Sequence, residues 1–295
     1  MRNVSALCAV FFSLCLIMSA FDSMAQGEAK DATEQTRKVQ KESAASLDFS
    51  DKSDFEDAMR GFIAPLPDNG RILGANNHET WNLAPYAFLQ DFNAAAPDTV
   101  NPSLWRQSQL CMIHGLFKVT DRIYQVRNAD ISNLTIIEGD TGLIIADPLI
   151  SEENAAKALN LYYEHRPRKP VKYVLYSHSH VDHYGGVQGV TSFQAVRDGT
   201  VRILAPKGFM EAAVAENVMA GSAMARRAQY MYGASLPPSP KGHVGAGLGL
   251  KNSSGTRGLI PPTDLIETNG ERRSLDGLTF VFLLAPDTEA PAEMH

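Results

Sequence analysis

Three histidines and an aspartate lie within the stretch SHSHVDHYGG, residues 177–186, of a chain that has 8 histidines among 295 residues. Neutral imidazole and carboxylate are side chains that bind zinc. His178 and His180 are two positions apart, so on an extended backbone both rings point to the same side and one metal ion can take both. Asp182 and His183 follow where the chain turns, and their side chains can face a second point nearby.

This spacing suits two adjacent metal ions better than one. Gly185 and Gly186 allow the backbone to turn tightly after the ligands. Two close metal ions polarise a substrate oxygen and hold a bridging hydroxide at neutral pH, so the pattern indicates hydrolytic chemistry. The alternative is a polar loop with surface histidines. Three histidines and an aspartate at a strand end, followed by two glycines, argue against that alternative.

The elements that must position this cluster alternate between strands and helices. Residues 171–176, VKYVLY, form a β-rich run that leads directly into the cluster. Residues 131–149 contain two apolar runs around Gly139-Asp-Thr-Gly142, which predicts a hairpin. Residues 151–165 have apolar residues at helical spacing, with two glutamates in the first turn, and predict a helix.

The elements after the cluster complete the expected layers. The sequence predicts a helix over 186–198, a strand over 200–205 and a helix over 208–232. Asn269-Gly270 predicts a hairpin turn, and residues 278–285 a final strand. We therefore predict an α/β fold with a partly antiparallel sheet. The histidines then lie beyond the carboxyl end of a buried strand, where ligands bind in open α/β sheets.

Composition excludes one class of partner. The chain has 27 Lys and Arg against 33 Asp and Glu, a formal net charge of -6, and no basic block. Nucleic acid is therefore not an expected partner. The hydrophobic content of 44% is ample for a core.

The N-terminal residues are expected to direct export. In residues 1–25, Arg2 precedes an apolar run, and the tripeptide SMA that ends at Ala25 offers a cleavage site, which is typical of a secretory signal peptide. A membrane anchor is the alternative, but the apolar run is short for a span. We expect a periplasmic or secreted protein without a stable membrane anchor after cleavage. Residues 26–53 are polar and charged and are predicted to be a flexible leader.

The metal-binding pattern, H-x-H-x-D-H, resembles the signature of the metallo-β-lactamase fold superfamily. Four further stretches are similar to the zinc alkylsulfatases of that superfamily: NVMAGSAMARRAQYMYG, GAGLG, GLIPPT and DTEAPAEM. The resemblance covers residues 54–295. It implies a metallo-β-lactamase-like αββα sandwich. It also implies zinc-dependent hydrolysis of alkyl sulfate esters to an alcohol and sulfate, through a metal-activated hydroxide.

The resemblance also implies which residues hold the two zinc ions. The first zinc would bind the positions that correspond to His178, His180 and Glu289. The second would bind those that correspond to Asp182 and His183. No other catalytic residue is identified.

Glu289 is the ligand that lies farthest from the others in the sequence. It follows the last predicted strand directly, between Pro286 and Pro291, where a loop can present a ligand rigidly. Glu293 is a competing candidate. The simpler alternative is that Glu289 is a solvated or structural carboxylate.

The resemblance further implies family features that have no counterpart up to residue 295. These are a bridging glutamate, another histidine of the second zinc site, a helical dimerisation domain and a lipid-carrier-like domain. We therefore expect a partial metallo-β-lactamase-like catalytic domain over 115–295, incomplete at its C-terminus, after an irregular segment over 54–114. The second zinc site would also be incomplete. A homodimer would belong to the full-length family.

Other functions stay open at this point. One is another hydrolase on the same fold, such as a lactonase or a β-lactamase. Another is a non-catalytic zinc-binding fragment that has lost activity. Met and Tyr residues within 210–232 could form an apolar wall for an alkyl chain, or simply pack as helix residues. Arg226 and Arg227 could attract a sulfate group, or be a solvated pair.

Overall fold

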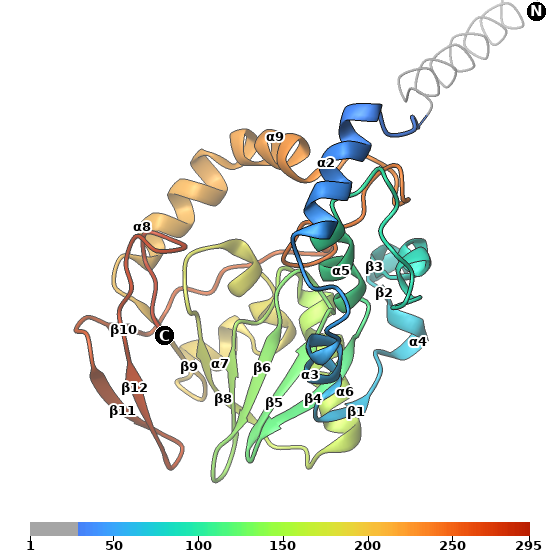
Figure 1. Ribbon diagram of the computed structural model, residues 1–295. Coiled ribbons are helices and arrows are strands. Elements are labelled where there is room, and N and C mark those ends of the chain that lie inside the picture. The colour runs from blue at the N-terminus through green and yellow to red at the C-terminus, as the bar shows by residue number, and fades with distance from the viewer. Residues whose placement is uncertain (1–28) are drawn as a thin grey trace, which may run out of the picture.

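The computed structural model describes residues 29–295, which are arranged around one eight-stranded sheet (Figure 1). Its strand order is β1-β4-β5-β6-β7-β8-β9-β10. The pairs from β1 to β7 are antiparallel, and those from β7 to β10 are parallel. The bounds are β1 Phe62–Ala64, β4 Gly115–Thr120, β5 Ile123–Arg127, β6 Leu134–Glu138, β7 Leu143–Ala146, β8 Val171–Leu175, β9 Arg202–Pro206 and β10 Asp264–Ile266. The predicted α/β class and mixed sheet are confirmed.

Two short antiparallel pairs accompany the main sheet. They are β2 Arg71–Leu73 with β3 Glu79–Asn82, and β11 Glu271–Leu275 with β12 Leu278–Phe282. The α-helices are α2 Glu34–Ala45, α3 Ser53–Met59, α4 Pro67–Gly70, α5 Pro102–Leu110, α6 Glu152–His165, α7 Phe193–Arg197, α8 Phe209–Val214 and α9 Gly221–Tyr232. Short 3-10 turns occur at Ala75–Asn77, Ala84–Leu89, Val181–His183 and Val187–Gly189. A π-helical turn spans Ala215–Met219.

The sheet separates two hydrophobic cores, because neighbouring residues of a strand point to opposite faces. On β7, Leu143 and Ile145 join the larger core together with residues of α6, whereas Ile144 joins the smaller core. Phe282 of β12 and Met294 belong to that smaller core, so the β11–β12 hairpin covers the second face. Strands β7 to β9 are thus buried on both faces, which accounts for their nearly continuous apolar sequences.

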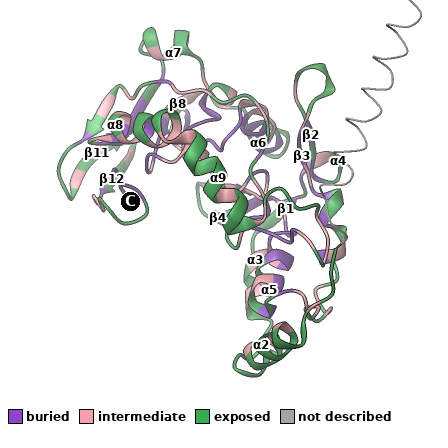
Figure 2. Cartoon of the chain, turned by 90° about the horizontal axis from the view of Figure 1, so that it is seen from above, coloured by how far each residue is buried: buried purple, intermediate pink, exposed green. Residues whose placement is uncertain are grey.

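The N-terminal part contains more regular structure than the sequence pattern indicated. The predicted leader, residues 26–53, contains helix α2, which begins after Thr33. Thr33 Oγ1 accepts a hydrogen bond from the Thr36 amide at 3.1 Å and so caps the helix. None of the residues of α2 is buried (Figure 2). The helix therefore lacks the apolar periodicity from which it could have been predicted.

The segment predicted to be irregular, residues 54–114, consists of short helices and strands that pack on the rest of the chain. Strand β1 pairs with β4, and Trp81 and Tyr86 lie in the larger core. The predicted signal peptide, residues 1–25, lies outside the described residues. Among residues 29–295, no helix has the length and apolar character needed to cross a membrane.

Three predicted elements differ from the structure. The helix expected over 186–198 is a 3-10 turn followed by the short α7. The helix expected over 208–232 is divided into α8, the π-helical turn and α9. The hairpin expected at Asn269-Gly270 is wrong, because β10 pairs in parallel with β9 while β11 pairs with β12. The hairpin turn lies instead at Asp276-Gly277, where both residues have positive φ.

Asp276, in that hairpin turn, fastens the β11–β12 pair to the main sheet. Its Oδ2 atom accepts hydrogen bonds from the amides of Thr141 at 2.9 Å and Gly142 at 2.6 Å. Its Oδ1 atom accepts from Thr141 Oγ1 at 2.6 Å and from Lys172 Nζ at 3.2 Å. The side chain is only 7% exposed. Burial alone would raise the pKa of Asp276, but these hydrogen bonds outweigh it and hold the pKa well below the usual value.

We expect Asp276→Ala to lower the free energy of unfolding at pH 7 by about 2–3 kcal/mol, because the amide of the buried Gly142 and three further donors on Thr141 and Lys172 lose a charged acceptor. The folded-state pKa of Asp276 is depressed, so its contribution is present above the unfolded value of 3.8 and is lost as the pH falls below it. Urea unfolding at pH 7 and pH 3 should therefore show a difference between variant and wild type that shrinks in acid.

Asp121→Ala is the matched control, since Asp121 is 95% exposed and pairs only with Lys118. It should leave the unfolding midpoint nearly unchanged. Equal stability of Asp276→Ala and wild type at pH 7 would contradict the role given to Asp276.

Candidate metal centre

The histidine cluster begins directly after β8, at the carboxyl end of a parallel strand. A single antiparallel bridge pairs His178 with Glu293, and the Met294 amide donates to the Ser177 carbonyl at 2.8 Å. The loop after β12 therefore lies against the backbone of the cluster. This contact brings Glu289 to histidines that precede it by more than 100 positions.

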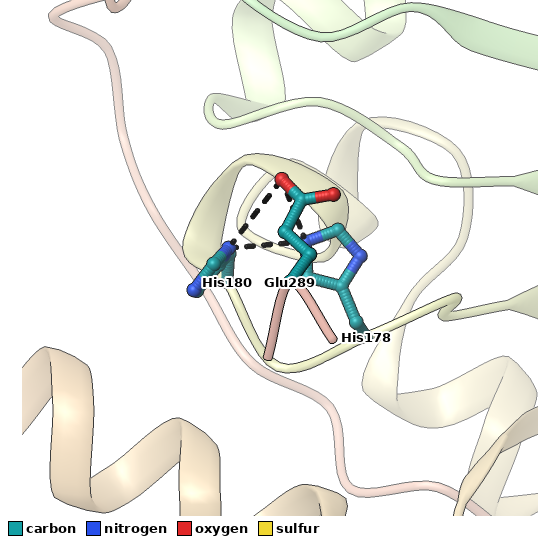
Figure 3. A group of neighbouring side chains, drawn as sticks. All are labelled: His178, His180 and Glu289. Carbon is teal, nitrogen blue, oxygen red and sulfur yellow. Dashed lines mark hydrogen bonds and ion pairs between the residues drawn. The ribbon is translucent and has the colours of Figure 1, made fainter. Parts of the chain in front are cut away.

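His178, His180 and Glu289 converge on one point (Figure 3). His178 Nε2 lies 3.1 Å from His180 Nδ1, and Glu289 Oε1 lies 3.9 Å from each of these nitrogens. Ligand atoms about 2.0–2.1 Å from a tetrahedral zinc ion are about 3.3 Å apart. Two imidazoles and one carboxylate are also an established donor set for zinc. The three residues therefore fit a metal ion without rearrangement of the backbone.

Asp182 and His183 lie beside this group, in the 3-10 turn that follows it. The rings of His178 and His183 have centroids 3.9 Å apart. His183 Nε2 lies 3.1 Å from Asp182 Oδ2, and His183 Nδ1 lies 3.0 Å from Asp147 Oδ2. The structure thus places the two predicted ligands of a second metal next to the first group, joined to each other rather than to His178 and His180.

The protonation of His183 is set by its two carboxylate neighbours. Burial disfavours the charged imidazolium, but the hydrogen bonds to Asp147 and Asp182 outweigh it and raise the pKa of His183 to about 10. Burial also lowers the pKa of His178, and there the positive charge of the neighbouring His183 and His180 lowers it further. His178 is therefore neutral at pH 7, the form that binds a metal ion.

Asp147 is a site residue that the sequence analysis missed. It follows β7, the parallel neighbour of β8, and has a φ of 55°. Its Oδ1 atom accepts from the Ser177 amide at 2.8 Å while Oδ2 contacts His183. The signal that could have revealed it is an Asp-Pro pair directly after a strand, because the ends of adjacent parallel strands meet at one edge.

The two glutamates of the loop have different positions. The Glu289 carboxylate faces the histidines, and its side chain is 59% exposed. Glu293 is buried, and its Oε2 atom accepts from Thr288 Oγ1 at 2.6 Å and from the amides of Glu289 at 2.8 Å and Ala290 at 3.1 Å. The structure therefore brings Glu289 to the histidines, whereas Glu293 holds the loop that carries it.

The residues considered for substrate contact lie mainly on the π-helical turn and α9. Helix α9 has no buried residue (Figure 2), so packing into a core does not account for its methionines and tyrosines. Met219 and Tyr230 are 81% and 86% exposed. Arg226 and Arg227 are also exposed. None of these side chains forms a hydrogen bond or ion pair with the predicted metal ligands among the described residues.

The chain is similar to several known proteins. The family model described as "Metallo-beta-lactamase superfamily" matches residues 127–292. A linear primary-alkylsulfatase from Pseudomonas sp is 56% identical over 96% of this chain and 42% of its own length. The alkyl/aryl-sulfatase BDS1 from Saccharomyces cerevisiae is 54% identical over 91% of this chain and 41% of its own.

A solved structure is similar over the same region. The stereoselective inverting sec-alkylsulfatase Pisa1 from Pseudomonas sp. matches with a TM-score of 0.85 and 45% identity, over 90% of this chain and 42% of that chain. The metallo-β-lactamase fold and the resemblance to alkylsulfatases that the motifs predicted are thereby confirmed. The chain spans about two fifths of the length of the curated relatives that it matches.

Glu293→Ala should weaken zinc binding without removing a ligand, because the loop loses the acceptor that holds Glu289 in place. We expect the zinc dissociation constant to rise about 10-fold, measured by competition with a chromogenic chelator. Glu267→Gln, an exposed change in the segment between β10 and β11, is the control and should bind zinc as the wild type does. If Glu293→Ala keeps wild-type affinity, Glu293 does not organise this loop for binding.

Proposed function

This chain belongs to the metallo-β-lactamase superfamily, and on that premise we propose that it hydrolyses alkyl sulfate esters to an alcohol and sulfate with the aid of bound zinc. The observation that carries the proposal is the convergence of His178 Nε2, His180 Nδ1 and Glu289 Oε1 at the end of β8. Similarity to proteins named alkylsulfatases over at least 90% of the chain supports the choice of substrate class.

His178, His180 and Glu289 would hold the first ion, and Asp182 and His183 would contribute ligands to a second. A divalent cation held at this place would polarise an ester oxygen and would lower the pKa of a bound water molecule toward about 7. Zinc is the metal we propose, because imidazole and carboxylate in this number suit it well.

The residues around the ligands fix how each ring is presented. Ser177 Oγ lies 3.0 Å from His178 Nδ1, on the side of the ring opposite Nε2. When Nδ1 carries the proton and donates it to Ser177, Nε2 keeps its lone pair for the metal. Asp147 performs the same task for His183, since its Oδ2 atom contacts Nδ1 and leaves Nε2 directed at Asp182. For His178 the chain therefore sets the tautomer before an ion arrives, whereas His183 has to lose its Nε2 proton first.

The substrate and the compartment are further parts of the proposal. An alkyl sulfate has an apolar tail, and the exposed Met219, Tyr230 and Met231 offer apolar surface on the π-helical turn and α9. Arg226 and Arg227 add positive charge on the same helix. Export to the periplasm or the medium is proposed from the signal-peptide pattern of residues 1–25 alone.

We expect the zinc-loaded chain to release sulfate from dodecyl sulfate, measured by ion chromatography. His180→Ala and a chelator should each lower the rate by more than about 100-fold, because a direct ligand or the ion itself is lost. Glu267→Gln is the control for purification and should match the wild type.

The same preparation is assayed with nitrocefin and with a lactone. Hydrolysis of either at a higher rate than dodecyl sulfate would replace the proposal with a β-lactamase or lactonase function. Zinc bound at full occupancy without turnover of any of the three substrates would identify a non-catalytic zinc-binding protein.

A further inference from the structure

The π-helical turn between α8 and α9, Ala215–Met219, is the only such segment among residues 29–295. Its wide turn is closed by a hydrogen bond from the Ala220 amide to the Ala215 carbonyl at 2.9 Å, five positions earlier. π-Helical turns are rare and frequently occur at functional sites, because the extra residue redirects the side chains around it. This turn contacts residues 177–183, the loop after β8 that carries the histidine cluster and is called the metal loop below, which indicates a role at the proposed site.

Two consecutive residues of the turn bind the residue between the two histidines. Ser179 Oγ donates to Glu216 Oε2 at 3.3 Å, and Asn217 Nδ2 donates to the Ser179 carbonyl at 3.3 Å. Asn217 Nδ2 also donates to the Ala213 carbonyl at 2.9 Å, which ties the turn to α8. Ser179 is fully buried, so these bonds form at a fixed point of the metal loop.

Helix α8 holds the turn in place from the other side. Phe209, its first residue, stacks on Tyr176 with ring centroids 5.0 Å apart and meets the edge of Tyr184 at 5.5 Å. All three rings are buried. Tyr176 precedes the histidine cluster and Tyr184 follows it, so one aromatic contact fixes α8 to both ends of the metal loop.

The ring of His180 lies between the metal site and Glu216. Its Nδ1 atom faces His178 Nε2 at 3.1 Å and Glu289 Oε1 at 3.9 Å. Its other nitrogen, Nε2, lies 3.8 Å from Glu216 Oε2. If Nδ1 binds the metal, the proton of the neutral ring must be on Nε2, and that N–H group needs an acceptor. Glu216 is the carboxylate at that position.

The 3.8 Å separation exceeds a charge-assisted hydrogen bond of about 2.8 Å, so the contact has to shorten by about 1 Å. The side chains of His180 and Glu216 are 30% and 25% exposed, so both have room to adjust. Hydrogen bonds around an active site are often long before the ligand binds and tighten afterwards. Rotation about the side-chain torsions of Glu216 is the movement that the proposal requires.

We propose that Glu216 is a positioning residue. Its carboxylate accepts a hydrogen bond from the Nε2–H group of His180 and thereby directs Nδ1 to the metal ion. The inference rests on the metal centre proposed above. The proposed role also explains the π-helical turn, because the turn presents Glu216 to His180 and Asn217 to Ser179 from successive positions. Glu216 itself is outside the group of three ligand atoms that converge on the first metal.

The test compares zinc affinity among Glu216 variants of the whole chain. Glu216→Ala should raise the zinc dissociation constant about 10- to 100-fold, the usual effect of losing a partner of a ligating histidine. Glu216→Gln keeps a neutral acceptor oxygen and should lie between Glu216→Ala and wild type. Glu211→Ala, an exposed change on α8, is the matched control and should bind zinc normally. Competition with a chromogenic chelator gives the affinities.

Two further readouts separate positioning from other roles. The thermal midpoint of the metal-free protein should fall no further in Glu216→Ala than in Ser179→Ala, since each loses the hydrogen bond between the two residues, whereas a purely structural Glu216 would lower it more. The visible spectrum of the cobalt-substituted protein should keep its band positions in Glu216→Gln. A loss of affinity in Glu216→Gln as large as in Glu216→Ala, with shifted cobalt bands, would mean direct ligation and would overturn the proposal.

The failure of this inference is distinguishable from failure of the metal centre. Wild-type affinity in Glu216→Ala would overturn the role of Glu216 alone. Absence of zinc binding by the wild type would overturn the centre on which the role depends. If Glu216→Ala does not fold, Glu216→Gln and Ser179→Ala carry the test. Ser179→Ala removes the donor that holds Glu216 and should weaken zinc binding in the same direction, and an unchanged affinity in both would refute the proposal.

Discussion

The bridge between His178 and Glu293 is the contact on which the proposed site depends. Without it, the histidine cluster would be a local motif at the end of β8, with no carboxylate from the distant part of the chain. The bridge exists because the loop after β12 returns to the sheet, where Met294 enters the smaller core. Hydrophobic burial on the second face of the sheet therefore decides where a polar ligand is presented on its edge.

The proposed site is also rich in negative charge, which favours a bound cation. Asp147, Asp182, Glu216 and Glu289 all lie within 4 Å of a histidine nitrogen. A proton on His183 offsets part of this negative charge. At the proposed site a bound cation would displace that proton, so metal binding would be coupled to proton release.

The sequence was informative where the signal is local. The spacing of the histidines, the hairpin between β6 and β7, and helix α6 all follow from neighbours within a few positions. Asp147 and Glu216 could not be found in this way, because strand pairing and an aromatic contact bring them to the site from other elements. The hairpin predicted at Asn269-Gly270 was wrong because a second turn-forming pair, Asp276-Gly277, lies a few residues later. Pairing of β10 with β9 places the hairpin at Asp276-Gly277 instead.

The exposure of helix α9 has consequences for its dynamics and for the substitutions that it can accept during evolution. A helix of 12 residues is only marginally stable without tertiary packing, and α9 buries none of its residues. Its amides should therefore exchange with solvent long before those of β7 and β8. Substitutions along α9 also cost the sheet and its metal ligands little, since surface changes have small effects on stability. The exposed surface of α9 is thus free to diversify in sequence while the sheet and the histidine cluster at the end of β8 stay unchanged.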